Sequence, residues 1–419
     1  MDKTKPFDIS KQVVWDAYQR VRANRGAAGV DGESLAMFEK DLKGQLYKVW
    51  NRMSSGSYFP PPVRLVEIPK RGKGGGKRPL GIPTVSDRVA QTVARMVLEP
   101  EVEPLFHVDS YGARPGKSAL DAVGVARERC WRRDWVIDLD IRSFFDSLDH
   151  DLLLRAVRHH TAQRWIPLYV KRWLRAPVQG IDGSCTERTR GVPQGGPLSP
   201  LLANLFMHYA FDVWMEREFP HIRFERYLDD VVVHCATEEE ARKLLCAIEG
   251  RLGECGLDLH PEKTKVVYCQ DSHRSGKHPD VHFDFLGYRF QPRPARSRRG
   301  KFFIGFLPAV SPSAANRIRA TIRAWRIPRW WSNRRLEDLA VLLAPFIRGW
   351  IHYYGRFYRS ELLRVLQCVN EVLVRWAHSK YRRFRRKPRQ ARHWLGRIAR
   401  RDPQVLALWQ LGVRPEAGR

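Results

Sequence analysis

The spacing of apolar residues along the chain predicts a mixture of strands and helices. Val14, Tyr18 and Val21 recur at helical spacing near the N-terminus, before the glycine-rich stretch RGAAGVDG interrupts the pattern. From about residue 135 to residue 290, strand-like runs alternate with helix-like runs, and strand patterns fade beyond residue 303. The pattern therefore predicts an α+β protein in which helices flank a mixed sheet and a helical region follows.

The last third of the chain contains a clear amphipathic helix pattern between Glu361 and Trp376. Its apolar residues recur at steps of three and four: Leu362, Val365, Leu366, Val369, Val372, Leu373 and Trp376. The next stretch, KYRRFRRKPRQARHWLGRIARR, is basic and contains aromatic residues at Tyr381, Phe384 and Trp394. Because aromatic rings can stack on bases, this composition favours nucleic-acid binding over a merely solvated charged surface.

Two groups of aspartates interrupt the strand patterns. In WVIDLDIRSFFDSLDHD, alternation places Asp138 and Asp140 on one face of a strand and the apolar residues between them on the other. Acids on such a face are costly unless they meet a cleft, a cation or water. Taken alone, this stretch also fits a surface edge strand with solvated aspartates. The adjacent Asp229 and Asp230, in RYLDDVVV, make that reading less favourable.

Carboxylates on a hairpin and on a neighbouring strand would form an oxygen-rich site suited to Mg²⁺. Two such ions, about 3.5–4 Å apart, stabilise the attacking and leaving oxygens of phosphoryl transfer. Adjacent strand residues point to opposite faces. We therefore expect Asp140 and Asp229 to be the main ligands and Asp230 to support them.

A glycine-rich loop precedes an apolar helix pattern in GVPQGGPLSPLLANL. We expect Ser199 to cap this helix, with Pro200 in its first turn. Gly195 and Gly196 would let the backbone approach a ligand closely, and Gln194 offers a donor and an acceptor to a base or sugar.

The 419 residues include 74 Lys and Arg against 45 Asp and Glu, which gives a net charge of +29. This charge favours a polyanionic partner. The seven cysteines form no C-x-x-C pair and fit a reducing compartment, so we expect a cytoplasmic protein with no membrane segment. Zinc binding is the alternative for Cys269, His273, His278 and His282, although their spacing matches no common ligand pattern.

Ten motifs along the chain resemble those of the bacterial group II intron reverse transcriptase/maturases, and they occur in the family's order. They are NRGAAGVDG, PPPVRLVEIPK, KRPLGIPTVSDRVAQ, SYGARPGKSALDAV, DIRSFFDSLDHDLL, GVPQGGPLSPLLANL, RYLDD, LHPEKTK, FDFLGYRFQPR and RGWIHYYGRF. The resemblance implies a right-hand polymerase. We expect an N-terminal helical extension at residues 1–50, fingers and palm at 51–290, a helical thumb or maturase region at 291–378, and a basic nucleic-acid-binding tail at 379–419.

The resemblance also implies roles for individual residues. Asp140, Asp229 and Asp230 would be the polymerase acids that hold two Mg²⁺ ions, with Mn²⁺ as an alternative ion. The residues that would contact the incoming dNTP are Lys70, Arg78, Phe145 and Gln194. Within this set, Lys70 and Arg78 would hold the triphosphate, Phe145 would exclude ribonucleotides at the 2′ position, and Gln194 would lie near the nascent base pair.

The implied activity is RNA-directed DNA synthesis, together with maturase activity in group II intron splicing and retrohoming. Its partners would be an RNA template, structured intron RNA, a DNA primer or target, and dNTPs. Two other functions stay open, namely an intron-free relative in DNA repair or phage defence, and a non-catalytic RNA-binding splicing factor.

The sequence departs from the family pattern at three points. Leu228 stands where alanine is usual, Ala113 stands where phenylalanine is frequent, and we expect no HNH-type endonuclease.

Overall fold

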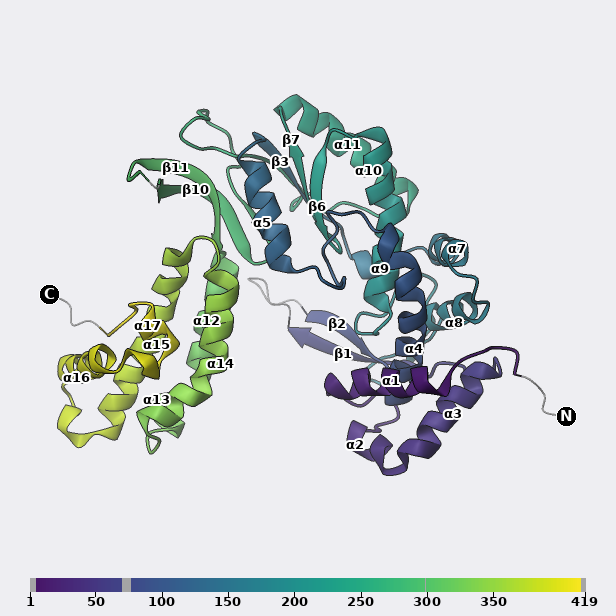
Figure 1. Ribbon diagram of the computed structural model, residues 1–419, viewed down its shortest axis with the longest axis horizontal. Helices are drawn as coiled ribbons and strands as arrows, with labels where there is room; N and C mark the ends of the chain where they lie inside the picture. Colours follow the sequence, from purple (N-terminus) through teal and green to yellow (C-terminus); the bar gives the residue numbers. More distant parts are fainter. Residues whose placement is uncertain (1–4, 70–76, 298, 416–419) are drawn as a thin grey trace. The chain divides into compact units, whose positions relative to one another are not determined.

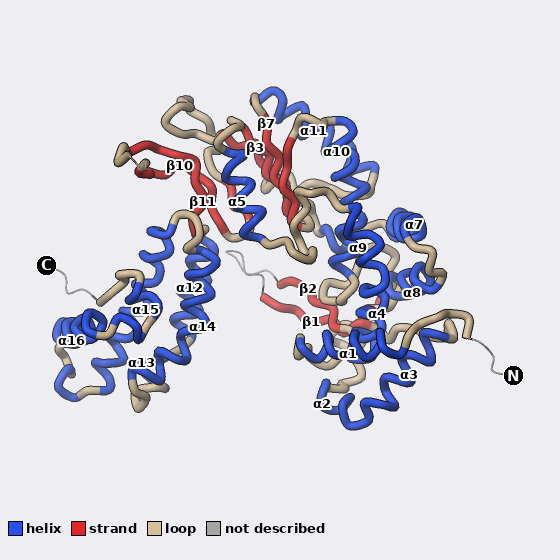
Figure 2. Tube along the Cα trace, viewed as in Figure 1, coloured by secondary structure: helices blue, strands red, loops and turns tan. Residues whose placement is uncertain are grey.

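The computed structural model describes residues 5–69, 77–297 and 299–415, which form two compact units. Unit 1 comprises Met1–Ala126 and Trp135–Val266, and unit 2 comprises Arg127–Asp134 and Val267–Arg419. Helices and strands occur in both units (Figures 1 and 2). The α+β class predicted from the apolar pattern is confirmed.

Helices make up most of unit 1. They are α1 (Lys11–Ala23), α2 (Leu35–Phe38), α3 (Leu42–Ser54), α4 (Val85–Val102), α5 (Ala119–Cys130), α6 (Phe144–Ser147), α7 (His150–His160), α8 (Trp165–Leu174), α9 (Ser199–Met207), the π-helix η3 (His208–Asp212), α10 (Val213–Glu218) and α11 (Glu238–Glu254), with short 3₁₀ turns η1 (Glu39–Asp41) and η2 (Glu103–Leu105). The last residues of α5 belong to unit 2.

The first four-stranded sheet has the order β6-β7-β3-β8. Its strands are β3 (Trp135–Asp140), β6 (Arg223–Tyr227), β7 (Asp230–Cys235) and β8 (Lys265–Tyr268). The side chains of Ile137 and Leu139 are buried, whereas Asp138 and Asp140 are only half-buried. The alternation predicted for this strand is therefore confirmed.

A second four-stranded sheet has the order β2-β1-β4-β5. Its strands are β1 (Val63–Pro69), β2 (Lys77–Ile82), β4 (Val178–Gln179) and β5 (Cys185–Thr186). The β1 and β2 strands are antiparallel, and β1 pairs in parallel with β4. The N–H of Gly81 in β2 donates to the Gln194 carbonyl at 2.7 Å, which ties the GVPQGG loop to this sheet.

A buried carboxylate organises the packing of α4 and α8. The carboxylate of Asp87, only 1% exposed, accepts hydrogen bonds from Tyr58 Oη (2.7 Å), Trp173 Nε1 (2.7 Å) and Gln91 Nε2 (2.9 Å). Burial raises the pKa of Asp87, and these three donors oppose that rise. One acid thus satisfies three buried donors from separate segments.

Unit 2 joins a three-stranded sheet to a group of helices. The sheet order is β11-β10-β9. The elements are β9 (Phe283–Phe285), β10 (Tyr288–Arg296), β11 (Phe302–Val310), α12 (Pro312–Ala324), α13 (Ile327–Trp330), α14 (Leu336–Tyr354), α15 (Arg359–Lys380), η4 (Arg382–Phe384), α16 (Pro388–Arg401), η5 (Pro403–Val405) and α17 (Ala407–Gln410). Every apolar residue of the predicted 361–376 helix pattern is buried in the core of this unit, so that prediction is confirmed.

The aromatic residues of the basic C-terminal stretch form one cluster of rings. Tyr381, Phe384 and Trp394 pack on one another with ring centroids 5.0–5.9 Å apart, and Phe384 is buried. The guanidinium of Arg383 lies 4.7 Å from the centroid of the Phe384 ring. Burial leaves the Phe384 ring no face for a base, so the expectation is wrong for Phe384. Stacking by the half-buried Tyr381 and Trp394 stays a prediction.

The alternative zinc site does not form within the residues that the structure describes. No group of three or more His, Cys, Asp or Glu side chains there is arranged to hold a metal ion. Cys269 is buried, while His278 lies against the ring of Tyr268 with centroids 4.2 Å apart. Among the described helices, none has the length and apolar character needed to cross a membrane.

We predict that Asp87→Ala lowers the free energy of unfolding by about 3–5 kcal/mol, because three buried donors lose their acceptor. Urea denaturation followed by circular dichroism measures this change. Asp121→Ala is the matched control, since the Asp121 carboxylate also accepts hydrogen bonds, from Ser118, but is exposed. Equal losses in the two variants would contradict the structural role of Asp87.

Candidate active site

Three aspartates meet at one end of the β6-β7-β3-β8 sheet, and we call Asp140, Asp229 and Asp230 the acidic cluster. The strand register places Asp140, the last residue of β3, directly opposite Asp230, the first residue of β7. Residues paired across antiparallel strands project from the same face. The strands are buried along most of their length, and exposure begins at these acids.

Asp229 lies in the turn of the β6–β7 hairpin, beside these paired acids. Leu228 and Asp229 are the two turn residues between Tyr227 and Asp230, which pair with each other. Of the two, only Leu228 has a positive φ, at 60°. A two-residue turn with a positive φ at its first position favours glycine there. The alternation argument that separated Asp229 from Asp230 does not apply, because Asp229 is a turn residue rather than a strand residue.

The surroundings of Asp230 shift the pKa of its carboxyl group. Although part of the residue is exposed, the pKa of its carboxyl group is raised to about 7, mainly by desolvation among surrounding protein atoms. The negative charges of Asp229 and Asp140 raise this pKa as well, while Lys263 lowers it. The acidic cluster therefore brings three carboxyl groups near enough for Asp229 and Asp140 to act on Asp230.

Lys263 is a member of the site that the sequence analysis did not identify. Its Nζ lies 3.2 Å from Oδ2 and 3.3 Å from Oδ1 of Asp140. The N–H of His260 donates to the Asp140 carbonyl at 2.8 Å, which anchors the segment before Lys263. The only signal was the motif LHPEKTK, whose lysines are separated from Asp140 by more than 120 residues.

Phe145 and Gln194 lie in two segments that pack together. Phe145 is half-buried in α6, and its carbonyl accepts a hydrogen bond from the N–H of Val192 at 2.7 Å. Gln194 Nε2 lies 3.5 Å from Oδ2 of Asp146, the residue after Phe145. The structure thus brings Phe145 and Gln194 to the same place.

The backbone of the GVPQGG loop is held close to β2. Gly195 has a φ of +123°, and a Cβ atom there would lie 2.5 Å from the Gly81 carbonyl oxygen. Glycine is required at this point because the two backbones leave no room for a side chain.

Ser199 does not cap the helix as expected. It is the first residue of α9, the N-cap position is Leu198, and the Ser199 hydroxyl donates to the Pro193 carbonyl at 2.7 Å. Pro200 does lie in the first turn, as predicted. The loop before α9 folds back over the start of the helix, so the Ser199 hydroxyl bonds to this loop instead of capping the helix.

Two residues expected to contact the nucleotide, Lys70 and Arg78, lie in or next to the gap between the described ranges 5–69 and 77–297. Arg78 belongs to β2, where its backbone pairs with Ile68 of β1. Lys70 lies outside the described residues.

We predict that Leu228→Gly is more stable than Leu228→Ala by about 1 kcal/mol. Both variants remove the side chain, but only alanine keeps the steric cost of a left-handed backbone. Thermal unfolding of the two purified variants, followed in parallel, measures the difference. A Leu228→Ala variant as stable as Leu228→Gly would show that the turn relaxes to another conformation.

Comparison with known proteins identifies the family. Residues 68–290 match the family described as reverse transcriptase (RNA-dependent DNA polymerase). Residues 315–394 match the group II intron, maturase-specific domain. The first match contains all three residues of the acidic cluster, together with Phe145 and Gln194.

Individual relatives agree with both matches. Protein YkfC of Escherichia coli (strain K12) is 30% identical over 341 residues, which cover 71% of this chain and 84% of that protein. The group II intron-encoded protein LtrA of Lactococcus lactis subsp. cremoris is 31% identical over 203 residues, covering 48% of this chain and 33% of LtrA. A putative COX1/OXI3 intron 1 protein of Saccharomyces cerevisiae is 29% identical over 200 residues, covering 48% of this chain and 24% of that protein.

These alignments span most of YkfC but a third or less of the two intron proteins. The resemblance inferred from the ten motifs is confirmed by the matches along the chain. The chain therefore belongs to the reverse transcriptase family and carries a group II intron maturase-specific domain.

Proposed function

We propose that this reverse transcriptase extends the 3′-hydroxyl of a primer on an RNA template, with the acidic cluster as its catalytic site. The observation that carries this proposal is the register of Asp140 opposite Asp230, next to the turn that holds Asp229. Carboxylates at the exposed end of a buried sheet can face a substrate while their strands stay fixed. A protein that only bound RNA would have no use for clustered acids facing a polyanion.

The donor atoms of the acidic cluster fit a divalent cation, and its three carboxylates do not form a ready-made metal-holding group in the described residues. Its side chains offer only carboxylate oxygens, which Mg²⁺ prefers. Desolvation, together with the negative charges of Asp229 and Asp140, raises the pKa of Asp230 to about 7. Lys263 offsets part of the charge at Asp140. We assign Asp140 and Asp229 as the main ligands of two Mg²⁺ ions, with Asp230 in support and Mn²⁺ as an alternative ion. When bound, such ions stabilise charge on the attacking and leaving oxygens of phosphoryl transfer.

The residues around the acidic cluster would select and orient the nucleotide. The half-buried ring of Phe145 would block the 2′ position of a ribonucleotide, and Gln194 would lie near the nascent base pair. We assign Lys70 and Arg78 to the triphosphate, since cationic side chains form strong charge-assisted hydrogen bonds with phosphate oxygens.

The distribution of charge and domains supports RNA partners. The chain has a net charge of +29, and RNA binding releases the counterions condensed on phosphates. We propose that fingers and palm lie at residues 51–290, and that structured intron RNA contacts residues 1–50, 291–378 and 379–419. The likeness to intron-encoded LtrA supports a second function in intron splicing and retrohoming.

Two other assignments make different predictions. An intron-free enzyme of DNA repair or phage defence would keep the polymerase activity but have no flanking intron RNA. A non-catalytic splicing factor would splice RNA without needing the acidic cluster.

We predict that Asp229→Ala lowers primer extension on an RNA template by about 100-fold or more, because charge stabilisation worth several kcal/mol is lost. Incorporation of labelled dNTP at saturating Mg²⁺ measures this loss. The exposed Asp121→Ala variant is the control and should retain synthesis. Intact synthesis by Asp229→Ala would refute the site assignment.

The Asp140→Ala variant separates the two proposed activities in one preparation. We expect splicing of a cognate intron RNA to survive while cDNA synthesis is lost, because RNA binding does not require the carboxylate. Loss of both activities in a folded variant would contradict that separation.

We predict that Phe145→Ala raises ribonucleotide incorporation relative to dNTP incorporation by roughly 10-fold or more, because the ring no longer excludes the 2′-hydroxyl. The ratio of kcat/KM for rNTP and dNTP measures this change. Phe145→Tyr keeps a ring of similar bulk and should discriminate as the unaltered enzyme does. Unchanged discrimination by Phe145→Ala would remove Phe145 from this role.

A further inference from the structure

A buried arginine connects the helices of unit 1 to the turn that carries Asp229. Arg226, in β6, is fully buried, and strand alternation directs it to the face opposite Tyr227 and Asp230. Its Nε and Nη2 donate to the two carboxylate oxygens of Asp212 at 2.7 and 2.6 Å. Asp212 is the last residue of the π-helix η3, and such helices are rare and often occur near functional sites.

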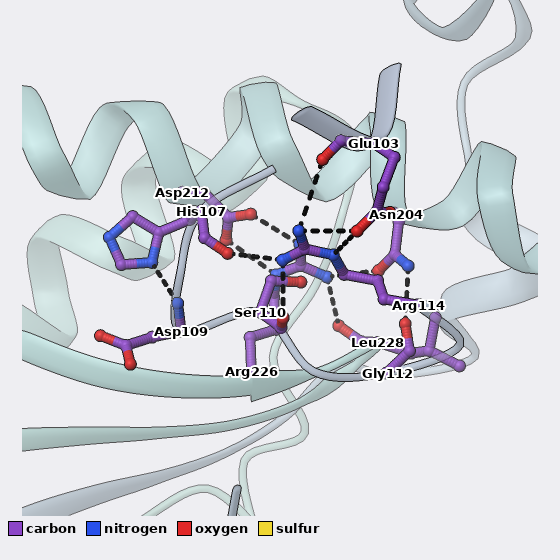
Figure 3. Close-up of polar contacts among 10 residues, drawn as sticks. All are labelled: Glu103, His107, Asp109, Ser110, Gly112, Arg114, Asn204, Asp212, Arg226 and Leu228. Carbon is purple, nitrogen blue, oxygen red and sulfur yellow. Dashed lines mark hydrogen bonds and ion pairs between the residues drawn. The ribbon is translucent and has the colours of Figure 1, made fainter. Parts of the chain in front are cut away.

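The remaining contacts of Arg226 reach the turn itself. Nη1 donates to Oδ1 of Asn204 at 2.9 Å and to the Leu228 carbonyl at 3.2 Å (Figure 3). The Leu228 carbonyl begins the peptide bond to Asp229. The buried guanidinium of Arg226 therefore donates directly to the half-buried residue of the turn that has the positive φ.

Asn204 extends this connection to residues 110–115, which we call the SYGARP segment. Its Nδ2 donates to the Gly112 carbonyl at 2.7 Å, while its Oδ1 accepts from Arg226 (Figure 3). A Cβ atom added at Gly112 would lie 2.6 Å from the backbone nitrogen of Leu228. The segment thus rests directly against the turn, and only glycine fits.

The SYGARP segment is itself anchored on both sides of Gly112. The N–H of Tyr111 donates to the Arg226 carbonyl at 2.8 Å. Arg114 donates to Glu103 Oε1 at 2.9 Å, to the His107 carbonyl at 2.7 Å and to the Ser110 carbonyl at 2.8 Å (Figure 3). The Leu228–Asp229 turn is therefore held between β6, α9 and the SYGARP segment.

We propose that Arg226 and Asn204 are positioning residues that hold the Leu228–Asp229 turn in its left-handed conformation and so set the place of the Asp229 carboxylate. This inference rests on the proposed function of the acidic cluster. A backbone in a sparsely populated conformation persists only where its surroundings impose it. The buried ion pair between Arg226 and Asp212 need not add stability, because removing two charges from water is costly. We therefore take the contact of Arg226 with the Leu228 carbonyl as evidence for a positioning role.

The test measures kcat, KM for dNTP and the Mg²⁺ concentration that gives half-maximal primer extension for Asn204→Ala. This variant removes the bridge between Arg226 and Gly112 without altering any of the three aspartates. We expect kcat to fall roughly 10- to 100-fold and the half-saturating Mg²⁺ concentration to rise several-fold, with KM little changed, because small displacements of a catalytic group have effects of this size.

Asn370→Ala is the matched control. Asn370 is as buried as Asn204, and it also bridges a donor and a carbonyl, accepting from Trp409 Nε1 and donating to Val413 in unit 2. We expect a comparable loss of thermal stability in this variant, with no change in half-saturating Mg²⁺. The contrast separates positioning from a general loss of stability.

Gly112→Ala tests the same turn from the other side, because the added methyl group would displace the Leu228 nitrogen. It should reproduce the lower kcat and the altered Mg²⁺ dependence, and it carries the test if Asn204→Ala does not fold. Unchanged kcat and Mg²⁺ dependence in the folded variant would overturn the positioning role. That outcome is distinct from failure of the proposed function, in which Asp229→Ala would still synthesise cDNA.

Discussion

Repulsion between neighbouring carboxylates is the constraint that the candidate site depends on. Strand pairing fixes Asp140 opposite Asp230, and the two-residue turn holds Asp229 beside them. Desolvation raises the pKa of Asp230, and the charges of Asp229 and Asp140 raise it further. Lys263 lies within 3.3 Å of both Asp140 oxygens and lowers this pKa. Carboxylate oxygens make the cluster suited to cations and, through them, to phosphate chemistry.

The other interior acids of unit 1 are arranged differently. Glu225 and His234 are both fully buried, with 2.6 Å between the carboxylate and the ring nitrogen. Asp212 has both oxygens bonded by Arg226, and Asp87 accepts from three donors. Each of these carboxylates has protein partners that satisfy it, as buried acids require. The acidic cluster differs because two of its members, Asp229 and Asp140, raise the pKa of the third, Asp230, as often occurs at functional sites.

Much of the site could be predicted because its parts are local in sequence. The period-two pattern of β3 placed Asp138 and Asp140 opposite the buried residues, and the apolar run of β7 predicted the strand after Asp230. What could not be predicted was set by long-range packing. Lys263 contacts Asp140 although more than 120 residues separate them in the sequence. Near the C-terminus, Phe384 is buried in the core of unit 2, with Tyr381 and Trp394 packed against that core, and no local pattern reveals this. The capping role expected for Ser199 failed for the same reason, since the loop before it folds back.

The sequence by itself determined which elements form and which chemistry the chain carries, because side-chain periodicity and ordered motifs are properties of short segments. It also marked Leu228 as unusual next to two acids. Only the tertiary structure decided that Leu228 adopts a φ of 60° and that its carbonyl meets Arg226. Those features depend on β6, α9 and the SYGARP segment converging at one point, and contacts between distant segments leave no local pattern in the sequence.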